Sequence, residues 1–217
     1  MSACIYIEGG ARGAGSKEVK IRCQEAFHKL LDRMGFMGRK PHLVACGGRS
    51  NVYDRFVTEH SHNAAGYVAI WIDGEEPLAN PEAAWEHLRT VATVSPWAKP
   101  PGAEDKQVLF MTTCMETWIV ADRDVLSNHY GRELQETALP PLVELEGRGR
   151  HDVQNKLEHA TRNCANAYMK GERSFEILGK LTPATLEKHL PSFGRVRRIL
   201  AEKLRAPLTP PRRGLNR

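Results

Sequence analysis

The chain has 217 residues, of which 41% are hydrophobic and 26% are charged, a composition typical of a globular protein with a core of its own. No apolar run approaches the roughly 20 residues of a membrane span, and residues 1–3 lack the basic start and apolar segment of a signal peptide. We therefore expect a cytoplasmic protein that makes no membrane contact.

Four short apolar runs predict strands, at residues 4–8, 41–46, 67–72 and 107–112. The segments between them carry helical patterns and helix boundary signals, at residues 16–34, 51–62 and 81–94. Strands that alternate with helices imply right-handed crossovers. The sequence therefore predicts an α/β fold, with a Rossmann-like parallel four-stranded sheet flanked by helices.

The composition changes at Pro140. Beyond it, helical patterns are expected at residues 152–169, 182–190 and 192–204. We predict three segments: an α/β catalytic core at 1–139, a helical extension packed on that core at 140–206, and a basic, disordered tail at 207–217.

Acidic side chains follow three of the predicted strands. They are Glu8, Asp73 with Glu75, and Glu116. The carboxyl ends of parallel strands meet at one edge of a sheet, and crowded carboxylates require either a cation or good solvation. We predict a site for Mg²⁺ or Mn²⁺ built from these four residues. The alternative for each residue is a helix cap or a solvated side chain.

A glycine-rich segment competes with this interpretation. Residues 10–17, GARGAGSK, match the first six positions of a phosphate-binding P-loop. A P-loop then needs lysine followed by serine or threonine, and here Ser16 precedes Lys17. Glu8 would also place a carboxylate at the mouth of the phosphate cradle. A nucleotide-binding NTPase is therefore the least favoured of the functions considered.

Several of these motifs together resemble the Toprim-like superfamily of topoisomerases, primases and OLD-type nucleases, and in particular an uncharacterised bacterial branch that carries Glu-x-Trp-x-x-x-Asp. The matching elements are the strand ending at Glu8, the strand ending in Asp73-Gly74-Glu75, and residues 116–122, ETWIVAD. Lys156, residues 168–170 (YMK) and residues 190–193 (LPSF) are also similar to that branch, so the resemblance covers most of the chain.

The resemblance implies a divalent metal and phosphodiester chemistry on nucleic acid. It gives Glu8 the role of general acid or base and gives the strand-end pair the role of metal ligands. The superfamily has Asp-x-Asp where this chain has Asp73-Gly74-Glu75, which leaves open whether Glu75 or Glu76 is the second ligand. The resemblance also implies an ATPase partner of the AAA or ABC type in defence against phage.

Basic residues provide candidate phosphate contacts. Arg49 directly follows Gly47-Gly48 at a strand end and is placed to bind a phosphate bidentately. Lys156 and Lys170 are candidates for stabilising charge on a phosphoryl oxygen. Residues 170–217 hold twelve Lys or Arg against four Asp or Glu, which favours a polyanionic partner. Within that segment the candidate nucleic-acid contacts are Arg195, Arg197 and Arg198, and the alternative is a solvated helix face.

These observations favour a divalent-metal-dependent nuclease that cuts DNA or RNA. A non-catalytic adaptor that binds nucleic acid or an ATPase through a degenerate Toprim fold is the main alternative. The two hypotheses differ in whether the acids act on a phosphodiester or only shape the fold.

Overall fold

The computed structural model describes residues 3–9, 16–62 and 66–204. The glycine-rich segment at 10–15 and the basic tail expected at 207–217 lie outside these ranges. A four-stranded sheet in the order β2-β1-β3-β4 forms the centre, and every neighbouring pair is parallel. Its strands are β1 (Ala3–Glu8), β2 (His42–Gly47), β3 (Tyr67–Asp73) and β4 (Val108–Met111). The predicted α/β fold class is confirmed.

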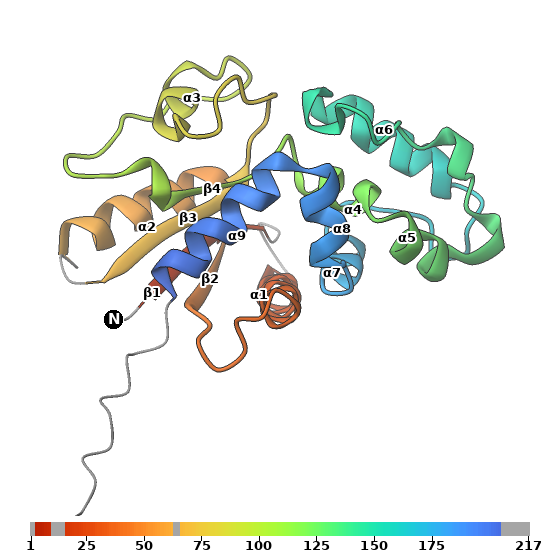
Figure 1. Ribbon diagram of the computed structural model, residues 1–217, viewed down its shortest axis with the longest axis horizontal. Coiled ribbons are helices and arrows are strands. Elements are labelled where there is room, and N and C mark those ends of the chain that lie inside the picture. The colour runs from red at the N-terminus through yellow and green to blue at the C-terminus, as the bar shows by residue number, and fades with distance from the viewer. Residues whose placement is uncertain (1–2, 10–15, 63–65, 205–217) are drawn as a thin grey trace, which may run out of the picture.

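Helices cover both faces of this sheet (Figure 1). They are α1 (Ser16–Arg33) on one face, and α2 (Arg49–His62) and α3 (Ala84–Thr90) on the other. Side chains alternate along β1, so Ile5 and Ile7 pack in the core that contains α1, whereas Tyr6 packs in the core that contains α2 and α3. β3 is buried along nearly its whole length, as expected for a central parallel strand.

The second half of the chain is helical and shares the core of α1. Its helices are α4 (Met115–Ala121), α5 (Arg123–Tyr130), α6 (Arg150–Thr161), α7 (Glu172–Leu178), α8 (Pro183–His189) and α9 (Pro191–Lys203). Short 3₁₀ turns occur at Asp105–Gln107, Gly131–Glu133, Glu136–Ala138 and Leu145–Gly147. In Figure 1, α4 to α8 form a group beside the sheet, and α9 returns to pack along β4. The division at residues 139 and 206 stays a prediction.

The helix expected at 152–169 is shorter than predicted. It ends at Thr161, whose hydroxyl oxygen accepts a hydrogen bond from the backbone N–H of Tyr168 at 2.9 Å, and this contact fixes a loop in place of further helical turns. Helix α7 was not predicted at all. The helix expected at 81–94 is limited to Ala84–Thr90. Each difference concerns a short segment whose ends are set by tertiary contacts.

The order of the strands locates a crevice. The chain leaves β1 through α1 toward β2 on one side, and leaves β3 through α3 toward β4 on the other. The carboxyl ends of β1 and β3 therefore flank the topological switch point, where open α/β sheets bind their ligands. Among the helices that the structure describes, none has the length and apolarity to cross a membrane.

Candidate functional site at the ends of β1 and β3

Glu8 and Asp73 are the last residues of β1 and β3, and they meet at the switch point. The backbone N–H of Asp73 donates to Oε2 of Glu8 at 3.3 Å. Oδ1 of Asp73 accepts from the backbone N–H of Met115, the first residue of α4, at 2.9 Å. These contacts use one oxygen of each carboxylate, and both residues line a pocket at this edge of the sheet. The strand pairing thus brings together two of the predicted acids.

Two glycines shape the backbone next to the acids. Gly9 directly follows β1, and Gly47 is the last residue of β2. The backbone N–H of each glycine donates to the carbonyl of the other at 3.0 Å. Both have positive φ, at 156° and 83°. A Cβ on Gly9 would lie 2.7 Å from Sγ of Cys23, so a side chain there would clash with α1. Glycine therefore allows the ends of β1 and β2 to turn close to each other beside Glu8.

Arg49, the first residue of α2, joins the two strand ends. Its Nη1 donates to the carbonyl of Asp73 at 2.9 Å and lies 3.7 Å from Oε2 of Glu8. The guanidinium stacks 4.5 Å from the ring centroid of Trp97. Its Nε and Nη2 are buried without a hydrogen-bond partner in the part of the chain that the structure describes. Arg49 therefore places a positive charge next to the two acids, while these two nitrogens are themselves buried.

A pocket of about 590 Å³ opens over the acid pair. Its lining combines carboxylates, glycines, a lysine and apolar side chains: Glu8, Gly9, Val19, Gly47, Gly48, Asp73, Met111, Met115, Met169, Lys170, Gly171 and Phe175. Lys170 is exposed. Burial raises the pKa values of Glu8 and Asp73, and the charge of Lys170 offsets part of that rise. The pocket therefore places a lysine cation near both acids.

The two carboxylates have raised pKa values. Burial, followed by the charges of Glu8 and Glu116, raises the pKa of Asp73 to about 8. Burial also raises the pKa of Glu8, and Arg49 only partly offsets it. The pair therefore resists carrying two negative charges when no cation is bound.

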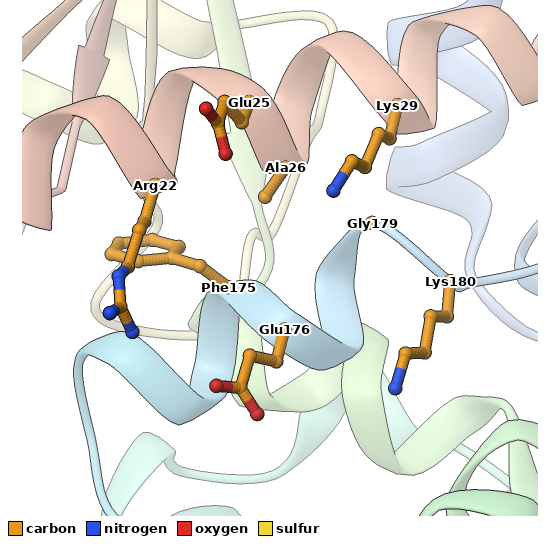
Figure 2. A pocket seen from close by; sticks show the side chains of 8 residues that line it. All are labelled: Arg22, Glu25, Ala26, Lys29, Phe175, Glu176, Gly179 and Lys180. Atoms are coloured by element: carbon orange, nitrogen blue, oxygen red, sulfur yellow. The ribbon is translucent and has the colours of Figure 1, made fainter.

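A smaller pocket of about 130 Å³ lies on the other side of Phe175, between α1 and α7. Figure 2 shows that its rim carries charges of both signs, from Arg22, Glu25 and Lys29 on α1 and from Glu176 with the neighbouring Lys180. The ring of Phe175 lines both pockets. The packing of α1 against α7 thus fixes one wall of the larger pocket.

Glu116 belongs to a separate buried network. It is fully buried on α4, with Oε1 accepting from the hydroxyl of Tyr168 at 2.5 Å and Oε2 accepting from Nε2 of Gln154 at 3.1 Å. The Tyr168 hydroxyl also contacts Oγ of Ser174 at 2.7 Å. Burial alone would raise the pKa of Glu116, but the charge of Lys170 and these hydrogen bonds together lower it. Both carboxylate oxygens of Glu116 are therefore already satisfied.

Glu75 points away from the acid pair. It is buried at 6% exposure with φ of 69°, its backbone N–H donates to the carbonyl of Thr113, and its carboxylate forms an ion pair with Arg150. It lines a neighbouring pocket of about 420 Å³ with Arg150 and Glu76. The side chain of Glu76 instead accepts the backbone N–H groups of Ala92 and Thr93. The structure thus does not bring Glu75 or Glu76 into the pocket of Glu8 and Asp73.

The other predicted phosphate contacts lie elsewhere. Lys156 is paired with Asp152 at 3.1 Å on the surface of α6. Arg195 is buried on α9 and donates to the carbonyls of Val108 and Asp105, both at 2.8 Å, so it holds α9 against β4. The remaining two arginines of α9 form ion pairs with acidic side chains, Arg197 with Glu187 and Arg198 with Glu82. A nucleic-acid role for these four residues stays a prediction.

Sequence reasoning missed two groups of residues. Arg150 is close enough to influence the site. Its charge offsets a small part of the burial-induced rise in the pKa of Glu8 and adds to the burial-induced lowering of the pKa of Arg49. The basic run of residues 148–150 was the only available signal for it. Tyr168 and Gln154 were missed as partners of Glu116, because nothing in their spacing shows that α6 and the loop before α7 converge on α4.

The donor set fits a magnesium ion, although not the four-carboxylate site that was expected. Among the described residues, no group of three or more His, Cys, Asp or Glu side chains is arranged to hold a metal. Mg²⁺ needs only one or two carboxylates, together with water and substrate phosphate oxygens. Glu8 and Asp73 supply two carboxylates whose mutual repulsion a cation would relieve.

Comparison with known proteins identifies one family. A family model described as "Domain of unknown function (DUF4276)" matches residues 16–201. The matched segment contains Arg49, Asp73, Glu116 and Lys170, whereas Glu8 precedes it. No curated protein and no solved structure matches the chain.

Proposed function

The chain belongs to the DUF4276 family, and we propose that it is a divalent-metal-dependent nuclease that hydrolyses phosphodiester bonds of DNA or RNA. One observation carries this proposal: the carboxylates of Glu8 and Asp73 meet at the switch point of the sheet, in a pocket also lined by Lys170 and next to Arg49. Carboxylates beside unpartnered cationic donors are suited to a metal ion and a phosphate together.

The acids and bases of the site have distinct tasks in this proposal. Glu8 and Asp73 would hold Mg²⁺ or Mn²⁺, which supplies charge neutralisation at the phosphate and activation of water. Glu8 would accept the proton that the attacking water loses and return it to the leaving oxygen of the phosphodiester. The roles implied by the Toprim resemblance are thereby kept for Glu8 and Asp73 and given up for Glu75.

The cations bind the phosphate. Arg49 is fixed by the Asp73 carbonyl and the Trp97 ring, so its positive charge is held next to the two acids before a substrate arrives. Lys170 is exposed on the loop before α7 and lines the pocket with the two acids, where it would bind the same phosphate. Fixed cations stabilise the negative charge that grows on phosphoryl oxygens in the transition state.

The wider setting follows from the Toprim-like resemblance. We propose that the protein acts in the cytoplasm beside an ATPase of the AAA or ABC type, as an effector of antiviral defence. This part of the proposal concerns the partner, and it is tested by pull-down of the tagged protein from a lysate of its own cells in ATP, in ADP and without nucleotide, with an ATPase of this type as the expected companion. Recovery of the chain alone under all nucleotide conditions would contradict it.

Cleavage assays test the nuclease. Purified protein is incubated with single-stranded DNA, duplex DNA and RNA in Mg²⁺ or Mn²⁺, and Glu8→Ala and Asp73→Ala are each expected to lower the rate roughly hundredfold or more. The matched control is Glu86→Ala, which removes an exposed acid paired with Arg89 on α3. Thermal melting in EDTA establishes that each variant is folded.

The outcomes separate the hypotheses. Cleavage that persists in both acid variants would overturn the proposal. Salt-sensitive binding of nucleic acid without cleavage by the wild type would favour the adaptor, because phosphate contacts weaken steeply with salt. Hydrolysis of nucleoside triphosphates with no action on polymers would favour the NTPase.

A further inference from the structure

The pocket over Glu8 and Asp73 has one apolar wall. Its apolar side chains are Val19 of α1, Met111 at the end of β4, Met115 at the start of α4, Met169 before α7, and Phe175 of α7. Met115 and Phe175 are mostly buried, whereas Met169 is 62% exposed. An apolar ligand surface in the pocket would cover Met169 and continue the apolar packing of its neighbours.

The lining of the same pocket also contains polar groups. It contains the two carboxylates and the glycines at the ends of β1 and β2, and Lys170 directly follows Met169 in the chain. A ligand that fills the whole pocket must therefore combine an anionic part with a flat or flexible apolar part. A nucleotide has both, as a phosphate and a base.

We propose that this pocket binds one unpaired nucleotide, with its base against Met169, Met115 and Phe175 and its phosphate toward Lys170 and a cation held by Asp73. The proposal rests on the proposed function and specifies its substrate as a single strand, a frayed end or a nucleotide turned out of a duplex. A base stacked inside a duplex cannot reach an apolar wall.

Size and chemistry agree with this occupant. A volume of about 590 Å³ is within the range of roughly 300–1,000 Å³ that small-ligand pockets occupy. Methionine side chains are flexible and make favourable contacts with aromatic rings without a fixed hydrogen-bond pattern. We therefore expect the pocket to accept purine and pyrimidine bases with similar affinity.

Calorimetric binding of mononucleotides tests the proposal, because these contain no internucleotide bond to cleave. In Mg²⁺, thymidine and adenosine 5′-monophosphates should each bind about tenfold tighter than inorganic phosphate, since the base covers apolar surface. Met169→Gln, an uncharged change of similar size, should remove that advantage and leave the affinity for inorganic phosphate within about twofold. The control is Met37→Gln, which makes the same change at a methionine that is 76% exposed and outside the pocket lining.

The results distinguish this inference from the proposed function. Nucleotides that bind no tighter than phosphate, or nucleotide binding that Met169→Gln and Met37→Gln weaken equally, would overturn the binding of a base at the apolar wall even if the protein cleaves nucleic acid. A preference for nucleotides over inorganic phosphate that depends on Met169 would support the binding of a base at the apolar wall even if no cleavage is found. Where the wild type is a nuclease, faster cleavage of single strands than of blunt duplexes is the further result expected.

Discussion

Two groups of buried acids lie close enough to influence each other, yet they have opposite surroundings. Glu8 and Asp73 each use one oxygen in the contacts described, face a pocket, and have raised pKa values. Glu116 is fully buried, has both oxygens hydrogen-bonded by Tyr168 and Gln154, and has a lowered pKa. The same chemical group is thus left open to a ligand in one region and fully satisfied in the other.

The difference assigns different roles to the acids. A buried carboxylate whose oxygens are all satisfied ties elements together, and Glu116 ties α4 to α6 and, through Tyr168 and Ser174, to the start of α7. Carboxylates with an oxygen facing a pocket destabilise the unliganded protein unless they gain a proton or a cation. Glu116 therefore stabilises the fold and holds the loop that carries Lys170. Glu8 and Asp73 each keep one carboxylate oxygen outside these contacts and line a pocket.

Alanine substitution should separate these roles most strongly. Glu116→Ala leaves the Tyr168 hydroxyl and the Gln154 amide without their acceptor, and we expect a loss of about 3 kcal/mol in the free energy of unfolding. Glu8→Ala removes one of two repelling acids and should change the free energy of unfolding by less than about 1 kcal/mol in EDTA. Urea denaturation measures both, and equal losses would contradict the contrast.

How far the sequence alone could anticipate the molecule depends on the range of the interactions. The strands and their order along the chain follow from local apolar runs, and Glu8 and Asp73 follow from the rule that parallel strands end at one edge. The ion pair of Glu75 with Arg150 and the hydrogen bonds of Glu116 join residues 38 to 75 positions apart, and no local pattern encodes them. Arg195 likewise resembled a solvated helix residue until its contacts with the residues before and in β4 were visible.

Removal of one hydroxyl should give a smaller effect in the same region. Tyr168→Phe takes away a donor to the charged Glu116, and we expect a loss of about 2 kcal/mol in unfolding free energy. Tyr53→Phe is the control, because its hydroxyl donates to the carbonyl of Ala98 at an exposed position. We also expect Tyr168→Phe to weaken phosphate binding, since Lys170 lies two residues further on. Unchanged stability would mean that Glu116 does not depend on this bond.

The pH dependence of stability should have opposite signs in the two regions. The pKa of Asp73 is raised from an ordinary 3.8 to about 8, so the folded state binds this proton more tightly than the unfolded state does. In EDTA, the contribution of Asp73 to the free energy of unfolding should therefore decline as the pH rises from about 3.8 to about 8. Asp73→Asn should make the free energy of unfolding less dependent on pH over that range. The pKa of Glu116 is lowered, so its contribution should be lost as the pH falls below about 4.5, and Glu116→Gln should remove that loss. Unfolding midpoints measured across this pH range decide both signs.

Divalent metal should produce the smallest shift and the one most specific to the open pair. A ligand that binds only the folded state stabilises it by about 0.4 kcal/mol at a free concentration equal to Kd and by about 1.4 kcal/mol at ten times Kd. We expect Mg²⁺ or Mn²⁺ to raise the unfolding midpoint of the wild type and of Tyr168→Phe, but not of Asp73→Asn. Protons and metal compete for Asp73, so the apparent affinity should increase as the pH approaches about 8. A metal shift that survives Asp73→Asn, or that does not depend on pH, would place the cation away from the ends of β1 and β3.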